Sequence, residues 1–169
     1  MGLSSITYKR TGEYRLYVLA RAMDPNGSGH LRTEALRDTA LLSYGVKSRT
    51  FATWLAGALE CGIFEGLHPV TRKICGREVT AFEVLRIRSQ AAAYKIFGCH
   101  SLDKCKSSIS LKQLFSPNWR ARILAAYIKA NHDGEIISLE KLSDLTGIPA
   151  RTLKKDRSEE RRVGKECRL

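Results

Sequence analysis

A seven-residue pattern that occurs twice constrains this chain more than any other feature of its sequence. Gly45–Phe51 (GVKSRTF) and Gly147–Leu153 (GIPARTL) share a glycine, a β-branched apolar residue, two variable residues, an Arg, a Thr and a large apolar residue. Each copy follows a short amphipathic stretch, and its glycine stands where a tight turn between two helices can use a positive φ. The repeat therefore predicts a two-helix unit at each of two places in the chain.

The apolar spacing around the first copy predicts three helices. We expect the first at 13–23, where apolar residues recur at the helical period, and the second at 33–42, with Thr33 as its N-cap. The third begins at Lys47 or Ser48 and directs an apolar stripe toward the core, made of Phe51, Trp54, Leu55, Ala58 and Leu59. Its opposite face opens with small, hydrogen-bonding and cationic residues, namely Lys47, Ser48, Arg49, Ala52 and Thr53.

After Gly62 the apolar period changes from that of a helix to that of a strand. The patterns in 63–67 and 79–84 predict two short strands around a basic loop at 69–77. The loop contains Arg72, Lys73 and Arg77, whose side chains can reach phosphates. A further helix is expected at 86–97, and a basic linker at 99–117 then separates a first domain, residues 1–98, from the rest of the chain.

The second copy of the pattern lies in a shorter segment, residues 118–156. We expect a helix at 118–131, another at 139–145 with Ser138 as its cap, and a last one that starts at Pro149, where a missing N–H costs nothing. Residues 157–168 resemble the translation of a common short-read sequencing adapter. We therefore expect 157–169 to be a non-native tail and the second unit to be truncated after Asp156.

The charge balance favours a polyanionic partner. The chain holds 29 Lys and Arg against 17 Asp and Glu, for a formal net charge of +12 and a pI near 9.8. Each cation that neutralises a phosphate releases a counterion and strengthens binding, so nucleic acid is the expected partner.

Several other classes of protein lack their sequence signatures here. Apolar runs fall short of the roughly 18 residues of a membrane span and no signal peptide is evident, so we expect a cytoplasmic protein with no membrane partner. The 5 cysteines form no CxxC pair, which argues against a disulfide framework and a metal site. Without a phosphate-binding loop, a nucleophile elbow or a partnered His, we expect no enzyme, no cofactor and no small-molecule substrate.

At the repeated pattern the sequence resembles the helix-turn-helix and winged-helix DNA-binding families, over residues 13–84 and 118–156. The resemblance implies a mostly α protein of tandem helix-turn-helix units, the first a winged helix with a small β-hairpin and the second truncated. It also implies that the start of each recognition helix contacts base edges, which gives Lys47, Ser48, Arg49 and Thr53 in the first unit and Ala150, Arg151, Lys154 and Lys155 in the second. Arg49 and Arg151 are the strongest candidates, because an Arg can donate two hydrogen bonds to guanine.

The leading hypothesis is sequence-preferring binding of duplex DNA by a prokaryotic or phage transcriptional regulator. Paired winged helices are also similar to those of plasmid or phage replication initiators, and the sequence does not separate the two roles. A winged-helix protein-interaction module that does not bind DNA is a third hypothesis, against which the basic start of the third helix argues. The oligomeric state, a homodimer included, stays open.

Overall fold

The computed structural model describes residues 10–74, 77–97, 110–116, 136–146 and 149–154, together with Trp119 and Arg122. The chain divides into two compact units. Arg10–Phe97 form one, called the hairpin unit here, and the remaining residues, Met1–Lys9 and Gly98–Leu169, form the other, called the C-terminal unit.

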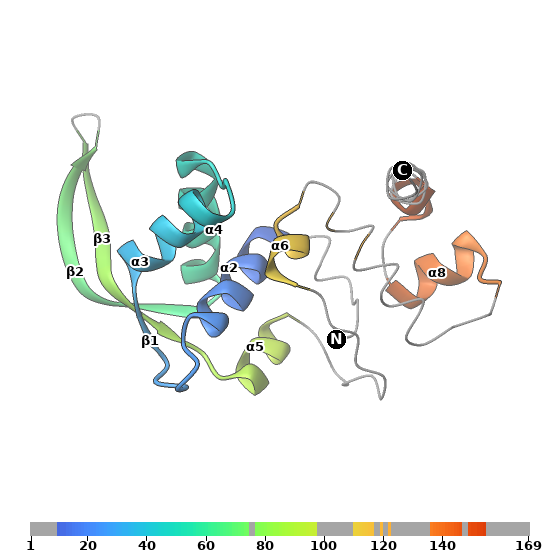
Figure 1. Ribbon diagram of the computed structural model, residues 1–169, viewed down its shortest axis with the longest axis horizontal. Coiled ribbons are helices and arrows are strands. Elements are labelled where there is room, and N and C mark those ends of the chain that lie inside the picture. Colours follow the sequence, from blue (N-terminus) through green and yellow to red (C-terminus); the bar gives the residue numbers. More distant parts are fainter. Residues whose placement is uncertain are drawn as a thin grey trace. The chain divides into compact units, whose positions relative to one another are not determined.

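The hairpin unit begins with helix α2, Thr11–Ala22, close to the predicted 13–23 (Figure 1). This helix buries Leu16, Leu19 and Ala20, which recur at the helical period. After the helix, the buried carboxylate of Asp24 accepts hydrogen bonds from the Ser28 and Gly29 backbone N–H groups, both at 2.8 Å, and from the Ser28 hydroxyl. These bonds fix the loop that carries the chain from α2 to the sheet.

A short strand leads directly into the second helix. Strand β1, His30–Arg32, is followed by α3, Thr33–Asp38, which continues as the π-helical turn η1, Thr39–Ser43. The helix predicted at 33–42 thus begins at its expected residue but changes its hydrogen-bond pattern halfway. The N-cap prediction is wrong, because Arg32 is the extended residue before the helix and Thr33 is the first helical one.

Helix α4, Ser48–Glu60, begins where the repeated pattern predicts it. The turn before it depends on Gly45, whose φ of +65° is a conformation that most other residues adopt only at a cost. The N–H groups of Gly45 and Val46 donate to the carbonyls of Leu41 and Ala40 at 3.1 and 3.0 Å, which closes the end of η1.

Three antiparallel strands form a sheet in the order β1-β3-β2 (Figure 1). Strands β2, Phe64–Ile74, and β3, Arg77–Ile87, make one long hairpin whose register pairs Phe64 with Ile87 at its base and Ile74 with Arg77 at its tip. The predicted mostly α fold of tandem helix-turn-helix units is therefore wrong, since long strands stand beside the helices.

The basic segment 69–77 explains most of this error. It lies almost entirely within the two strands rather than in a loop. Both faces of the outer hairpin carry exposed residues, so the strands there show no alternation of apolar and polar residues. Residues 86–87, predicted as helix, end β3, where Ile87 is buried.

The core of the hairpin unit lies between the helices and the base of the hairpin. Its fully buried side chains include Leu16, Leu36, Phe64 and Leu85. Helix α5, Gln90–Ile96, follows β3 and is capped by the Ser89 hydroxyl, which accepts a hydrogen bond from the Ala92 N–H at 3.3 Å. After α5, the Phe97 ring packs edge-on against Tyr14 and Tyr17 of α2, with centroid distances of 5.5 and 6.2 Å. The last residue of the unit therefore contacts its first helix.

Short helices make up the described part of the C-terminal unit. Helix α6, Leu111–Leu114, lies within the segment predicted as a linker and begins with a capping box between Ser110 and Gln113. Helix α8, Leu139–Thr146, matches the prediction for 139–145, and the Ser138 hydroxyl accepts from the Lys141 N–H at 3.1 Å, as an N-cap does. Residues 150–154 are helical after Pro149. Most of the helix predicted at 118–131, and all of 157–169, fall outside the described residues.

Candidate nucleic-acid interface

The first turn of α4 exposes three of the residues predicted to contact bases. Lys47 is the N-cap residue, with φ −69° and ψ 142°, and no side chain of the described residues caps the helix. Lys47, Ser48 and Arg49 are all exposed, and the first turn contains no acidic residue. The N–H groups at the helix start and the two cations make this end of α4 positive, which favours an anion or an electronegative base edge.

The rest of the outward face of α4 is made of small residues. Arg49 is followed along this face by Ala52, Thr53 and Ala56, all exposed, whereas Phe51 and Ala58 are buried on the opposite side. The Thr53 hydroxyl donates its hydrogen to the Arg49 carbonyl at 3.0 Å. Its oxygen can therefore only accept a hydrogen bond from a ligand. Small side chains let a helix approach base edges closely, and alanine methyl groups suit the methyl group of thymine.

The predicted phosphate-contacting residues lie on the hairpin. Arg72 and Lys73 are adjacent and exposed in β2, opposite Val79 and Glu78 in the register. Because side chains alternate along a strand, the two cations point to opposite faces of the hairpin. Arg77 is the first residue of β3, and its side chain lies outside what the structure describes. The prediction that these three residues lie in a loop is wrong, because Arg72 and Lys73 lie in β2 and Arg77 begins β3.

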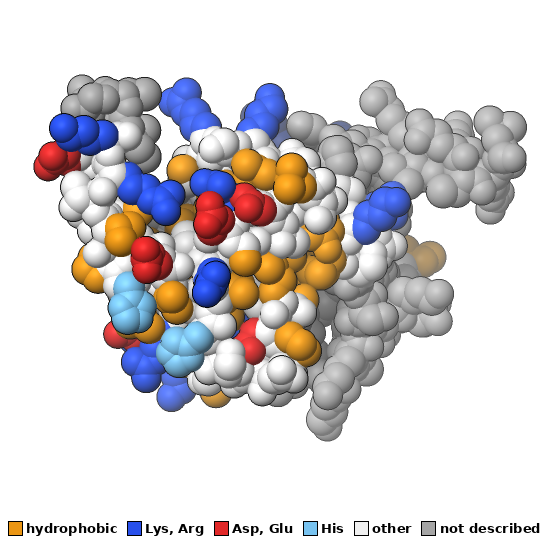
Figure 2. Space-filling model, turned by 60° about the vertical axis from the view of Figure 1, so that its left-hand side comes forward, with side chains coloured by type: hydrophobic (Ala, Val, Ile, Leu, Met, Phe, Trp, Pro, Cys, Tyr) orange, Lys and Arg blue, Asp and Glu red, His pale blue; other side chains and the backbone are white. Residues whose placement is uncertain are grey.

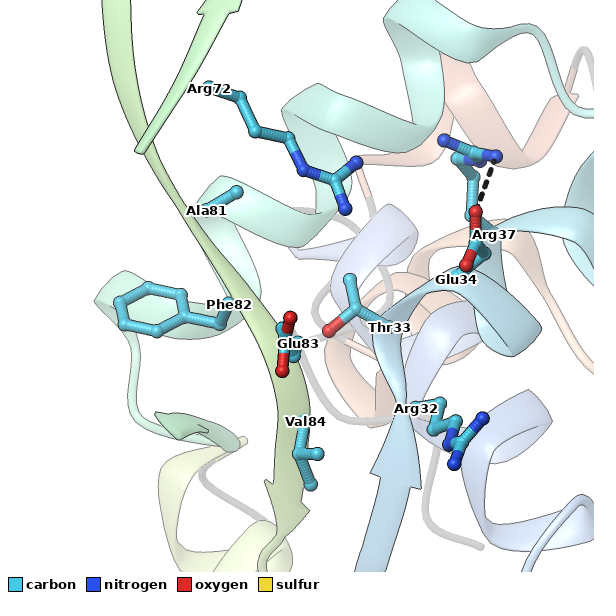
Figure 3. A pocket seen from close by; sticks show the side chains of 9 residues that line it. All are labelled: Arg32, Thr33, Glu34, Arg37, Arg72, Ala81, Phe82, Glu83 and Val84. Atoms are coloured by element: carbon cyan, nitrogen blue, oxygen red, sulfur yellow. Dashed lines mark ion pairs between the residues drawn. The ribbon is translucent and has the colours of Figure 1, made fainter. Parts of the chain in front are cut away.

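A pocket of about 410 Å³ lies between α3 and the hairpin, on the face of β2 to which Arg72 points (Figure 3). Residues 32–34 and Arg37 line it on one side, and Arg72 and residues 81–84 line it on the other. Figure 3 shows the Arg72 guanidinium extending from β2 into the space between the two walls. The pocket was not predicted, because β1 and β3 bring its residues together from distant parts of the sequence.

The ion pairs around this pocket leave Arg72 unneutralised. Arg37 lies 3.0 Å from Asp38 and 3.6 Å from Glu34. By contrast, no carboxylate of the described residues lies within ion-pair distance of Arg72. Figure 2, in which the hairpin side comes forward, shows Lys and Arg side chains interspersed with Asp and Glu rather than gathered in one patch. The face in Figure 2 therefore presents no single basic patch, and Arg72 is a cation without a carboxylate partner among the described residues.

The second set of predicted base-contacting residues lies in the C-terminal unit. Ala150, Arg151 and Lys154 are exposed on the helical segment after Pro149, and Leu153 is fully buried, so the segment presents one face outward. Lys155 lies outside the described residues. The two sets of predicted base-contacting residues belong to different units of the chain.

Two other kinds of feature, a metal-binding cluster and a membrane-spanning helix, are not found in the part of the chain that the structure describes. No group of three or more His, Cys, Asp or Glu residues there is arranged to hold a metal ion. Cys61 is a free, half-buried thiol. The described helices include none with the length and apolar character needed to cross a membrane.

Comparison of the chain with models of protein families, with curated proteins and with solved structures found no match.

Proposed function

We propose that this chain binds duplex DNA with a preference for sequence, with the start of α4 in the major groove and the hairpin against the backbone. The exposed, basic first turn of α4 is the observation that carries the proposal. Arg49 would donate to base edges, Ala52 and Thr53 would allow close approach, and Lys47 would contact a phosphate.

The arrangement of the hairpin unit supports this use of α4. The helix follows a tight glycine turn after α3 and η1, and a long hairpin comes directly after it (Figure 1). A hairpin that follows the helix directly can bring its cations to the phosphate backbone while the start of the helix lies in the groove. Arg72 and Lys73 are the described cations of the hairpin that suit this contact.

For the biological role we propose regulation of transcription in the cytoplasm. A regulator of this kind binds one operator near a promoter, whereas a replication initiator binds a series of short repeats at an origin. Selection of preferred duplexes from a random pool, followed by mapping of those sites in the source genome, separates the two roles.

Salt-dependent binding is the direct test of the proposal. Fluorescence anisotropy can measure the affinity of the full chain for a labelled random duplex at about 50 and about 200 mM salt. If the protein contacts four phosphates, the affinity should be about a hundredfold lower at the higher salt concentration. Arg49→Glu should weaken binding strongly, because it places a negative charge at the start of α4. Lys95→Glu, which makes the same charge change at an exposed position of α5, is the matched control and should have a smaller effect. A folded chain that fails to bind at the lower salt would favour a protein-interaction module.

A further inference from the structure

We propose that the pocket between α3 and the hairpin binds one phosphodiester group of the DNA backbone, held between Arg72 and Arg37. The inference rests on the proposed function and adds a defined phosphate site to it. It places a backbone contact beside α3, in addition to those made by the start of α4.

The two arginines supply donors from opposite walls of the pocket. Arg72 extends from β2 into the space that Arg37 faces from α3 (Figure 3). Arg72 has no carboxylate partner among the described residues, so its donors are available without breaking an ion pair. The Arg37 Nε and Nη2 atoms donate to the Asp38 carboxylate at 3.1 and 3.0 Å, whereas its Nη1 has no partner among the described residues and can donate to a phosphate oxygen. Guanidinium groups bind phosphate oxygens through paired hydrogen bonds.

The charge of the pocket favours a diester over a free phosphate. Its lining includes three arginines, Arg32, Arg37 and Arg72, and two glutamates, Glu34 and Glu83, which leaves a net charge of +1. A phosphodiester carries one negative charge, and the lining can neutralise it. A phosphate dianion costs far more to desolvate, because that cost grows with the square of the charge, while its attraction to a net +1 only doubles. The glutamates therefore select for the singly charged group of a nucleic-acid backbone.

The salt dependence of binding to a labelled duplex tests the site. Log affinity falls as log salt rises, and Arg72→Ala and Arg37→Ala should each make that fall less steep by about 0.9. Each variant should also reduce the affinity about eightfold at 0.1 M salt. The double variant should lose little more than either single variant, since both residues hold the same phosphate. Glu83→Gln should bind the duplex more tightly. Lys95→Ala, a control that removes one exposed cation from α5, should leave the slope unchanged.

Three other outcomes overturn the proposal in distinguishable ways. If the wild-type chain binds DNA but the two arginine variants behave like Lys95→Ala, the pocket is not a phosphate site and the proposed function stands. If millimolar inorganic phosphate competes with the duplex for the wild-type chain but not for Arg72→Ala, the pocket holds free phosphate rather than a diester. If the folded wild-type chain shows no salt-sensitive binding at all, the proposed function and the pocket assignment both fail.

Discussion

Arg49 stands on the exposed face of α4, one position after the residue that begins the helix. If it reads a guanine, Arg49→Ala should cost about 1–3 kcal/mol on a preferred duplex and little on a scrambled one. Arg49→Lys keeps the charge but loses the planar pair of donors, so it should lose sequence preference while keeping most of the general affinity. Anisotropy with the two duplexes measures both. If Arg49→Ala loses the same affinity on both duplexes, Arg49 contacts a phosphate rather than a base.

Thr33 carries a buried hydroxyl that has no hydrogen-bond partner among the described residues. A buried polar group left in this state costs about 1–3 kcal/mol, so Thr33→Val, which keeps the shape of the side chain, should raise the melting temperature. Thr39→Val is the matched control in the same helical segment, because the Thr39 hydroxyl donates to the Ala35 carbonyl at 2.8 Å and its loss should not stabilise. Thermal unfolding followed by circular dichroism compares them, and a lower melting temperature for Thr33→Val would contradict the account.

The loop after α2 should make stability depend on pH. The Gly29 N–H and the Ser28 hydroxyl, helped by Arg21, hold the pKa of Asp24 below its ordinary value of 3.8. A lowered folded-state pKa means that the ionised carboxylate stabilises the fold fully above 3.8, and that this contribution is lost as pH falls through the lower folded value. Asp24→Asn should therefore melt below wild type by a constant margin at neutral pH, and the margin should shrink in acid. Parallel melting profiles across the whole pH range would contradict this.

At the residue scale, the sequence located exposed residues better than it located a pocket. Lys47, Ser48, Arg49 and Thr53 are exposed on α4 as the helical period predicts, because one amphipathic helix determines their side. Arg37 and Arg72 share a pocket only because β1 pairs with β3 and carries α3 to the hairpin. The pairing of β1 with β3 cannot be predicted from the pattern of apolar and polar residues around Arg37 or Arg72.

At the scale of elements, two glycines control how closely α2 and α4 approach. A Cβ on Gly12 would overlap the ring of Trp54, which also lies 5.2 Å beneath the Arg15 guanidinium. A Cβ on Gly57 would instead meet the flexible end of the Glu13 side chain. Gly12→Ala should therefore destabilise the unit by about 1–3 kcal/mol through overpacking.

Gly57→Ala is the matched comparison for that prediction. The Glu13 side chain can turn away, and alanine is favoured over glycine inside a helix by about 0.5–1 kcal/mol, so this variant should be neutral or more stable than wild type. Urea unfolding of both variants measures the difference. Equal destabilisation by the two substitutions would contradict the view that the Trp54 ring leaves no room for a Cβ at Gly12.

The elements that the sequence predicted well are those whose apolar residues face a single core. Helices α2, α4 and α8 fall within a few residues of their predicted bounds for this reason. The strands were underestimated because β1 is only three residues long and the outer hairpin buries neither face. At η1 the chain stays helical but changes its hydrogen-bond pattern, and apolar spacing does not distinguish a π-helical turn from the end of an α-helix.

For the whole molecule, the division into two units raises the question of which one would carry the proposed DNA binding. The hairpin unit contains the α4 surface, the described hairpin cations and the pocket. The C-terminal unit contributes Arg151 and Lys154 on a separate exposed helical face. A protein that uses both surfaces can bind two neighbouring half-sites, and its affinity then exceeds that of either unit alone.

Residues 10–97 alone should fold and should keep the sequence preference of the full chain. Their core is closed by contacts within the unit, including those of Phe97 with Tyr14 and Tyr17, and Tyr17 also donates to the Arg88 carbonyl at 3.2 Å. A cooperative thermal transition of this fragment would show that it folds by itself. Its affinity for a preferred duplex should fall relative to that of the full chain. The ratio between its affinities for preferred and scrambled duplexes should stay the same, because the proposed function assigns the base contacts to α4. If the folded fragment binds the two duplexes equally, the sequence preference must come from Arg151 and its neighbours in the C-terminal unit.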